Sequence, residues 1–511
     1  MAIEVIKETF QSNKEVGTEE VEALVETQIY LSPTKADMEK LIWVKNKVDI
    51  LDRRIIKDKI IVSGRIKYDV LYKSPDEEMN LHTLDTDVEF TEEILIEGIE
   101  EDMESYIDTK IEHTEWELFE NKVELKSLVN IKIAVREIKE FYLASEIKGE
   151  EGLQTLQEPI NYRGFFAQQV SYASLGDDIT IEEKLAEIDT ILNFHIDVRE
   201  EETIISEDRI ITSANIKLNI IYYGEDQIHA LEEEFSLNHF IEIEGIDSSF
   251  ITKVKFEDIQ GSYEIRDNEL GESKIIHCDI KIKVIGEAYY ECLQNLITDA
   301  YSTRDNLDIQ GEEIQLSESL KTLDYEDEIQ LEIGEVDALE VLDMEYRISN
   351  IQSSIEEDLI VDSILSLDII YIHKMTGELT RHSEHFPFRT TIDGNLESDL
   401  DIRLESRVSD IRSIIKKDSL EVDAKINHNI ELLKTRNVYG IVELEKGTEA
   451  LSQKSRPSIT IYIVQKGDTL WDIAKRYNTT MNMINSLKEN QDDLQLGDKI
   501  IIEKEVEDIE I

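Results

Sequence analysis

Residues 59–72 read Lys-Ile-Ile-Val-Ser-Gly-Arg-Ile-Lys-Tyr-Asp-Val-Leu-Tyr, and this stretch decides the fold because the chain contains it three times. The second copy is Arg209-Ile-Ile-Thr-Ser-Ala-Asn-Ile-Lys-Leu-Asn-Ile-Ile-Tyr222, and the third is Asp358-Leu-Ile-Val-Asp-Ser-Ile-Leu-Ser-Leu-Asp-Ile-Ile-Tyr371. The closing tyrosines lie 150 and 149 residues apart. Recurrence at a nearly fixed period indicates repeated copies of one structural unit.

Two further landmarks follow each copy in the same order. The first is an apolar segment that ends in glycine: Phe90 to Gly98, Phe235 to Gly245 and Phe386 to Gly394. The second is an alternating segment: Ile131 to Val135, Ile280 to Val284 and Ile426 to Ile430. The first 457 residues are therefore dominated by a triplicated domain.

The landmarks predict β-strands, since apolar and polar residues alternate with period two and Ile, Val and Tyr are abundant. We expect a mainly β protein with three antiparallel, sandwich-like domains at residues 15–147, 155–302 and 310–445. A short helix within a repeat, such as residues 182–188, is compatible with this class. Each landmark glycine is expected at a turn or bulge that needs a permissive backbone. Residues 446–457 lose the alternation and end in proline, which predicts a mobile linker.

A different pattern fills residues 458–504. Residues 461–464 are a hydrophobic strand, and Lys466-Gly467 predicts a turn. Asp468 or Thr469 can cap the helix that follows, with Leu470, Ile473, Ala474 and Tyr477 on its buried face. A second capped helix from Thr479-Thr480 and a closing strand at 499–503 give a small α+β module of strand, helix, helix and strand. Residues 505–511 are an acidic tail.

This module resembles a LysM module in the order and spacing of Gly467-Asp468-Thr469-Leu470-Trp471, Ile473-Ala474, Tyr477 and Leu496-Gly497-Asp498-Lys499-Ile500. LysM modules are non-catalytic binders, usually of N-acetylglucosamine-containing glycans such as peptidoglycan. The resemblance implies that the loops after the first strand and before the last strand bind the ligand or partner. The residues carried over are Gly467, Asp468, Thr469, Leu470, Trp471, Asp492, Asp493, Leu494, Gln495 and Leu496. Trp471 is expected at the edge of the module core, where core packing and partner contact are both open.

The second loop differs from that of many glycan-binding relatives. Asp492 and Asp493 put two carboxylates where a sugar would lie. A neutral sugar gains little from adjacent carboxylates, whereas a basic patch on a protein would pair with them. A protein ligand is therefore the first hypothesis for this module, and a glycan is the alternative.

Three acidic β repeats before one LysM module resemble, over nearly the whole chain, the SPOCS-and-LysM proteins of spore-forming clostridia. The resemblance implies a spore-envelope morphogenesis factor, made in the mother cell, that binds the coat-basement ATPase or another coat protein and surrounds the forespore. It implies a non-enzymatic assembly scaffold for the spore coat, with self-association of the repeats as a further option. The alternative is a peptidoglycan-binding cell-wall protein in which the repeats are spacers.

Composition and charge fit a folded, acidic protein. The formal net charge is −60, from 114 acidic and 54 basic residues, which disfavours nucleic acid and anionic lipid as partners. We expect neither a signal peptide nor a membrane span, which predicts that the protein stays inside the cell that makes it. The resemblance implies that this cell is the mother cell and that the protein lies at the forespore surface. The two cysteines, Cys278 and Cys292, cannot form a disulfide framework, which fits a reducing compartment.

No residue pattern indicates an enzyme. Cys278 and Cys292 stand in strand-like contexts without a paired base, and no phosphate-binding Gly-x-x-x-x-Gly-Lys occurs. His382 and His385 lie three apart on a strand, so they point to opposite faces and are expected on an exposed hairpin edge. We therefore predict no catalytic residues, no metal site and no cofactor, and keep an unrecognised hydrolase as a third hypothesis.

Overall fold

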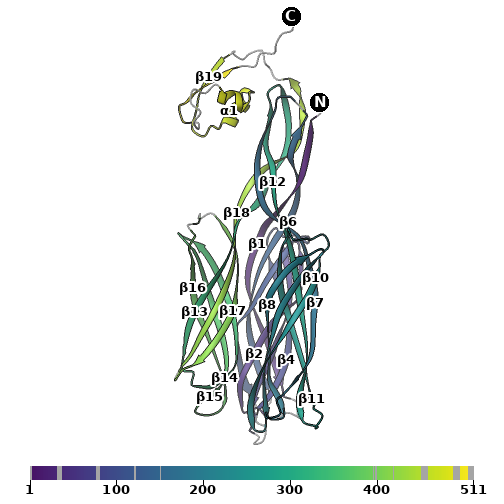
Figure 1. The fold of residues 1–511 in the computed structure, drawn as a ribbon, viewed down its shortest axis with the longest axis vertical. Helices are drawn as coiled ribbons and strands as arrows, with labels where there is room; N and C mark the ends of the chain where they lie inside the picture. Colours follow the sequence, from purple (N-terminus) through teal and green to yellow (C-terminus); the bar gives the residue numbers. More distant parts are fainter. Residues whose placement is uncertain are drawn as a thin grey trace.

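A computed structural model describes residues 3–31, 37–75, 81–119, 122–149, 151–394, 396, 400–417, 419–450, 459–486 and 495–503. The chain is mainly β, as predicted, with long antiparallel strands and a small α+β region near its C-terminus (Figure 1). No helix among the described residues is long and apolar enough to cross a bilayer.

Copy 1 of the repeat folds into two facing sheets. Its strands are β1 (Glu4–Tyr30), β2 (Lys40–Ile56), β3 (Lys59–Lys73), β4 (Leu81–Leu95), β5 (Glu104–Phe119) and β6 (Lys122–Lys148). One sheet has the order β1-β6-β5 and the other has the order β2-β3-β4. Both sheets contribute to one buried apolar cluster, so the copy is a sandwich.

Copies 2 and 3 repeat this topology. Copy 2 has β7 (Leu153–Thr180), β8 (Thr190–Ser206), β9 (Arg209–Gly224), β10 (Gln227–Glu242), β11 (Ile251–Asp267) and β12 (Ser273–Ser302). Copy 3 has β13 (Asp305–Gly334), β14 (Ala338–Ile355), β15 (Leu359–His373), β16 (Leu379–Ile392), β17 (Asp401–Ile415) and β18 (Ser419–Ala450). The sheets β11-β12-β7 of copy 2 and β13-β18-β17 of copy 3 are joined through β7 and β13 into one six-stranded sheet, and the other sheets have the orders β10-β9-β8 and β14-β15-β16. Each copy has its own core.

The triplicated stretch is the central strand of one sheet in each copy: β3, β9 and β15. Its alternation is visible as alternating burial. In β3, Ile60, Val62, Ile66 and Tyr68 are almost fully buried and share one face with the buried Gly64, whereas residues 61, 63 and 65 on the other face are partly exposed. At the end of the strand this rule breaks, because Val70, Leu71 and Tyr72 are all buried. Leu71 must therefore be covered by something other than the core of its own copy.

The cover comes from the other copies. Trp43 and Leu71 of copy 1 form one buried cluster with Ile221 of copy 2 and Ile370 of copy 3. We call this contact of β2-β3-β4, β8-β9-β10 and β14-β15-β16 the junction. The junction joins the three sandwiches side by side, as the lower part of Figure 1 shows.

A second inter-copy contact forms a stalk. The outer halves of the paired strands β1/β6, β7/β12 and β13/β18 run together beyond the sandwiches, toward the N-terminus in Figure 1. They bury Phe10 and Leu143 of copy 1 against Tyr162 of copy 2 and Leu316 of copy 3. The Tyr162 hydroxyl donates to the Thr9 carbonyl at 2.9 Å. The three copies therefore contact one another at two places, the junction and the stalk.

Two of the landmark glycines occupy the expected turns. Gly98 and Gly245 have φ of +86° and +91°, which glycine adopts at little cost. Their amides donate to the carboxylates of Asp58 (2.8 Å) and Asp208 (2.7 Å), which sit at equivalent hairpins. Gly394 donates in the same way to Asp358 at 3.3 Å without a positive φ.

Two expectations about the repeats need correction. Residues 182–188 form a turn, in which the Leu185 amide donates to the Glu182 carbonyl at 2.9 Å, and not a helix. Residues 446–450, expected to begin the linker, extend β18, since Lys446 pairs with Leu307 and Ala450 with Asp305. Alternation is weak there because Glu445 and Lys446 are exposed even though they lie in a strand. Residues 451–458, the rest of the expected linker, lie outside the described residues.

The C-terminal module has the predicted order of elements. They are β19 (Ile459–Ile463), α1 (Leu470–Tyr477), α2 (Met481–Ser486) and β20 (Lys499–Glu503). Strands β19 and β20 pair antiparallel. Ile473, Ala474 and Ile484 are fully buried beneath them.

Candidate functional site

The loop after β19 is held by the side chain of Asp468. Its carboxylate accepts from the Tyr462 hydroxyl at 2.6 Å and from the Gln465 amide at 2.8 Å. The Tyr462 hydrogen bond and then the Gln465 amide hold the pKa of Asp468 below its usual value. Gly467 completes the turn with φ of +91°. Asp468 therefore shapes this loop through its contacts within the module.

The next residue starts the helix. Thr469 is the N-cap of α1: its hydroxyl oxygen accepts from the Asp472 amide at 3.1 Å, and the Asp472 carboxylate accepts from the Thr469 amide at 3.4 Å. This reciprocal pair is a capping box, which confirms Thr469 as the cap. Gly467 and Thr469 remain exposed and Leu470 is half-buried.

The loop before β20 is built in the same way. Asp498 accepts from the Gln495 amide at 2.9 Å, and Gly497 has φ of +92°. The amides of Asp468 and Asp498 also close the same kind of turn onto the carbonyls of Gln465 and Gln495. Two Gln-x-Gly-Asp turns thus flank the sheet.

Backbone hydrogen bonds bring these loops together. The Val464 amide donates to the Asp498 carbonyl at 2.9 Å, and the Gly497 amide donates to the Val464 carbonyl at 3.0 Å. Gln495 and Leu496 are exposed, Leu496 by 72%. The other expected residues of this loop, Asp492, Asp493 and Leu494, lie outside the described residues.

Trp471 is placed differently from its expected position at a partly accessible edge. Its ring is 6% exposed because the module packs against the end of the stalk. The indole Nε1 donates to Asp299 Oδ2 at 2.8 Å, and the ring meets Tyr301 edge-to-face with centroids 4.9 Å apart. Lys475 Nζ pairs with the same carboxylate at 2.6 Å.

Two more polar contacts hold the module on the stalk. The Tyr301 hydroxyl donates to the Thr479 carbonyl at 2.6 Å, and the Asn478 amide nitrogen donates to the Ser302 carbonyl at 3.2 Å. Burial, with a smaller contribution from Asp299, raises the pKa of Tyr301 to about 12. The stalk therefore covers the Trp471 face of the module, whereas Gly467, Thr469 and Leu496 stay exposed.

A polar cluster at the junction is the second candidate site. Lys45 lies opposite Asp69 in copy 1, His195 opposite Asn219 in copy 2, and Glu345 opposite Asp368 in copy 3. Lys45, His195 and Glu345 are thus the same structural position in three copies. They converge, because the Lys45 ammonium donates to Glu345.

Asp343 lies at the centre of this cluster with a fully buried side chain. Its carboxylate accepts from Asn193 at 2.9 Å, Asn219 at 3.0 Å, and His195 Nδ1 at 3.1 Å. The Met344 amide donates to it at 2.9 Å. Such dense hydrogen bonding satisfies a buried charge that would otherwise be costly.

The charges stabilise one another. Burial disfavours protonated His195, but the hydrogen bond and charge of Asp343 outweigh it and raise the pKa of His195. Burial likewise disfavours ionised Asp343, and His195 outweighs it and lowers the pKa of Asp343. Both groups are therefore driven toward their charged forms.

His195, Asp343 and Glu345 could in principle ligate a metal, since one donor atom from each lies within 4.8 Å of the others. The neighbouring hydrogen-bond donors favour a different interpretation. Lys45 already supplies a cation to Glu345 and lies 4.0 Å from Asp343. We therefore interpret the cluster as an ion-pair network that joins the copies. The sequence pattern gave no sign of it.

The predicted pair His382 and His385, and His373 near them in the sequence, do not contact one another. His382 contacts Glu384 at 3.2 Å, His385 contacts the Ser366 hydroxyl at 2.8 Å, and the His373 ring nitrogen accepts from the Met375 amide at 3.3 Å. Each ring thus has its own local partner.

The cysteines are poor nucleophiles. Burial, followed by the charges of Asp177, Asp178 and Asp279, raises the pKa of the Cys278 thiol to about 12. Burial also raises the pKa of Cys292. Both are free thiols, protonated at neutral pH, so neither has the thiolate character of a catalytic cysteine.

Comparison with known families gives two matches. Residues 37–133 and 187–266 match the family described as "SipL, SPOCS domain", and residues 462–503 match the family described as "LysM domain". No curated protein and no solved structure matches the chain significantly. The two matched types are non-catalytic binding modules, and together they indicate a sporulation-related protein that binds glycan of the peptidoglycan kind. Segments of the first two repeat copies thus match the SPOCS domain, and the C-terminal module matches the LysM domain.

Proposed function

We propose that this protein is a non-enzymatic assembly scaffold of the spore envelope, made in the mother cell and recruited to the forespore surface through its LysM module. The observation that carries the proposal is the way the module is mounted. Asp299 and Tyr301 fix it to the end of a stalk built by all three copies, and Gly467, Thr469 and Leu496 in the described parts of its loops are exposed. A fixed mount keeps a binding module at a set orientation and lowers the entropy lost on binding.

The ligand that we favour for the module is a protein, either the coat-basement ATPase or another coat protein. The outer face of its sheet carries Ile459, Ile461 and Ile463, which are 59%, 66% and 49% exposed. Leu496, at 72% exposed, lies in the adjoining loop. A row of exposed aliphatic side chains suits an apolar protein surface better than a hydroxylated sugar.

The remaining surface fits a scaffold. The chain carries a formal charge of −60, which keeps it soluble at high concentration and favours basic partners. Self-association of the repeats would have to overcome this repulsion, so we place partner capture ahead of it.

The test is capture of the coat-basement ATPase by the full chain, alongside co-sedimentation with peptidoglycan. Ile461→Gln is expected to weaken partner capture at least fivefold and leave peptidoglycan sedimentation unchanged. Ile204→Gln is the matched control, because Ile204 is an exposed strand isoleucine (49%) far from the module in sequence. Equal capture by both variants, together with micromolar peptidoglycan affinity, would establish the wall-binding alternative instead.

A further inference from the structure

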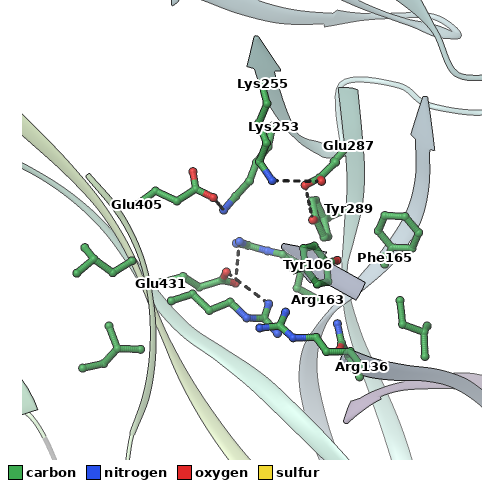
Figure 2. A pocket seen from close by; sticks show the side chains of 15 residues that line it. Tyr106, Arg136, Arg163, Phe165, Lys253, Lys255, Glu287, Tyr289, Glu405 and Glu431 are labelled. Carbon is green, nitrogen blue, oxygen red and sulfur yellow. Dashed lines mark hydrogen bonds and ion pairs between the residues drawn. The ribbon is translucent and has the colours of Figure 1, made fainter. Parts of the chain in front are cut away.

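A cavity of about 370 Å³ lies where the stalk meets the sandwiches, and all three copies line it (Figure 2). Copy 1 contributes Arg136 from β6, and copy 2 contributes Lys253 from β11. Copy 3 contributes Arg403 from β17. Its volume is in the range of small-molecule sites.

The lining is cationic in a strongly acidic protein. Five basic side chains face three carboxylates, a local net charge of +2 when each has its usual charge. The basic residues are Arg136, Arg163, Lys253, Lys255 and Arg403. The whole chain, by contrast, has a formal net charge of −60. A positive concavity on such a molecule concentrates small anions locally.

The carboxylates neutralise only part of this charge. Lys253 pairs with Glu405 at 3.2 Å, and Lys255 pairs with Glu287 at 3.4 Å (Figure 2). The buried carboxylate of Glu431 pairs with the guanidinium groups of Arg163 and Arg403, and Arg163 also pairs with Glu291, outside the lining, at 2.8 Å.

Those two guanidinium groups are unequally paired. Arg163 NH1 lies 2.8 Å from Glu431 Oε1, and Arg403 NH1 lies 3.8 Å from Glu431 Oε2. Burial lowers the pKa of Arg403, Glu431 opposes this, and the like charge of Arg136 lowers it further. Arg136 and Arg403 line the same cavity, so their like charges face a common space and repel each other.

Arg136 is the basic residue of the lining for which the described residues provide no carboxylate partner. Within the described residues it has no ion pair, and its guanidinium lies over the Tyr106 ring at 5.0 Å. Two like charges beside one another, with one lacking a carboxylate, favour the entry of an anion between them.

Unsatisfied polar atoms on the lining point the same way. Arg163 Nε, a donor, and two acceptors, Asn13 Oδ1 and Glu431 Oε1, are buried and lack a hydrogen-bond partner in the described structure. Buried polar atoms without partners are rare and indicate a missing ligand or water. The missing group must both accept from arginine and donate to an amide oxygen.

We propose that this cavity binds a small phosphate monoester that carries hydroxyl groups. The phosphate oxygens would accept from the arginines, and a hydroxyl would donate to Asn13. The rings of Tyr106 and Tyr289 on the lining would contact the organic part. A simple dicarboxylate satisfies the arginines but supplies no donor for Asn13, so we expect it to bind more weakly.

Calorimetric titration of the full chain tests this at constant ionic strength, with glucose 6-phosphate, inorganic phosphate and succinate as probes and chloride as the reference. Constant ionic strength matters because any salt screens the self-repulsion of so acidic a chain. We expect glucose 6-phosphate to bind most tightly and succinate least. Binding of succinate alone, or of no probe above chloride, overturns the proposal.

Arg136→Gln should weaken glucose 6-phosphate binding at least tenfold. Lys132→Gln is the matched control, because Lys132 lies on the same strand, is exposed, does not line the cavity and loses the same charge. Arg136→Lys keeps the charge but not the planar fork, so an intermediate loss is expected even if Arg136→Gln folds poorly. Equal binding by the Arg136→Lys and Lys132→Gln variants would refute the assignment.

Discussion

Replacing Asp343 with asparagine is expected to loosen the junction between the three copies. The side chain is fully buried, and it accepts hydrogen bonds from His195, Asn193 and Asn219. An asparagine keeps one acceptor oxygen and turns an NH₂ group toward neighbouring donors. About two hydrogen bonds to a charged group are lost, each contributing about 1.5–3 kcal/mol. His195 and Lys45 also lose the countercharge, so the total cost should be about 3–5 kcal/mol.

Trp43 reports on this perturbation directly. Its ring is 4% exposed within the junction cluster, and the Lys45 ammonium lies 5.6 Å from its centroid. Urea unfolding followed by tryptophan fluorescence should therefore include a transition for the junction. With a urea dependence of about 2–3 kcal/mol/M, the variant should lower that midpoint by roughly 1–2.5 M. A Trp43→Phe background identifies which part of the signal comes from the junction.

Asp362→Asn is the matched control. Asp362 lies in the same copy and pairs with Arg389 at 2.8 Å, but both side chains are exposed, 46% and 63% respectively. Exposed ion pairs contribute about 0–1 kcal/mol, so this midpoint should barely move. If the two variants shift the Trp43 transition equally, the central role given to Asp343 is wrong.

Three more predictions follow from described contacts. Because the folded-state pKa of His195 is raised, the stabilisation that protonated His195 provides is present below about pH 6.5 and disappears as pH rises through the folded-state pKa. His195→Gln should therefore reduce the change of the urea midpoint between about pH 6 and 9. A variant whose midpoint changes with pH as much as that of the unmodified protein would exclude His195 as the titrating group. Asp299→Ala removes the acceptor of Trp471 and the partner of Lys475, so the LysM module should be released faster by limited proteolysis than in the exposed-site control Asp362→Ala, and equal rates would contradict docking through Asp299. With its thiol pKa raised to about 12, Cys278 should react with iodoacetamide at pH 8 at least a hundredfold more slowly than free cysteine, as measured by mass spectrometry, and rapid alkylation would reopen a role for it as a nucleophile.

Most strands and the helix cap could be predicted from the sequence because the patterns that specify them involve residues close together in the chain. Alternation in residues 59–72 and its two counterparts predicts a strand whose one face is buried, and β3, β9 and β15 have that burial. In the LysM module, Thr469 is an N-cap whose function depends on neighbours three residues away. Such short-range patterns can be read without knowing the tertiary structure.

The contacts between copies could not be read in this way. One equivalent position in the three copies is occupied by Lys45, His195 and Glu345, which differ in chemical type. Comparing the sequences of the copies therefore does not reveal that these side chains meet. One signal was present: residues 70–72 and their counterparts break the alternation with three consecutive apolar side chains. A strand buried on both faces needs a second covering surface, which here is the other copies.

Trp471 illustrates the same limit. Its place on α1 predicted an edge position, but how far it is exposed depends on Tyr301, 170 residues earlier in the chain. The unsatisfied atoms of the cavity, on Asn13, Arg163 and Glu431, likewise come from three segments that are distant in the sequence and meet only in the fold.

The unlike residues at the junction bear on how a triplicated chain can arise. Three separate, identical subunits meeting at this point would bring three identical side chains together: three lysines or three glutamates would repel one another. Covalent fusion frees each copy to diverge, so that a lysine, a histidine and a glutamate neutralise one another around one aspartate. The junction then distinguishes the copies, because a chain with two of them exchanged would no longer match donor to acceptor. The three copies thus form an asymmetric assembly, in which the order of the copies is tied to one set of charges around the buried Asp343.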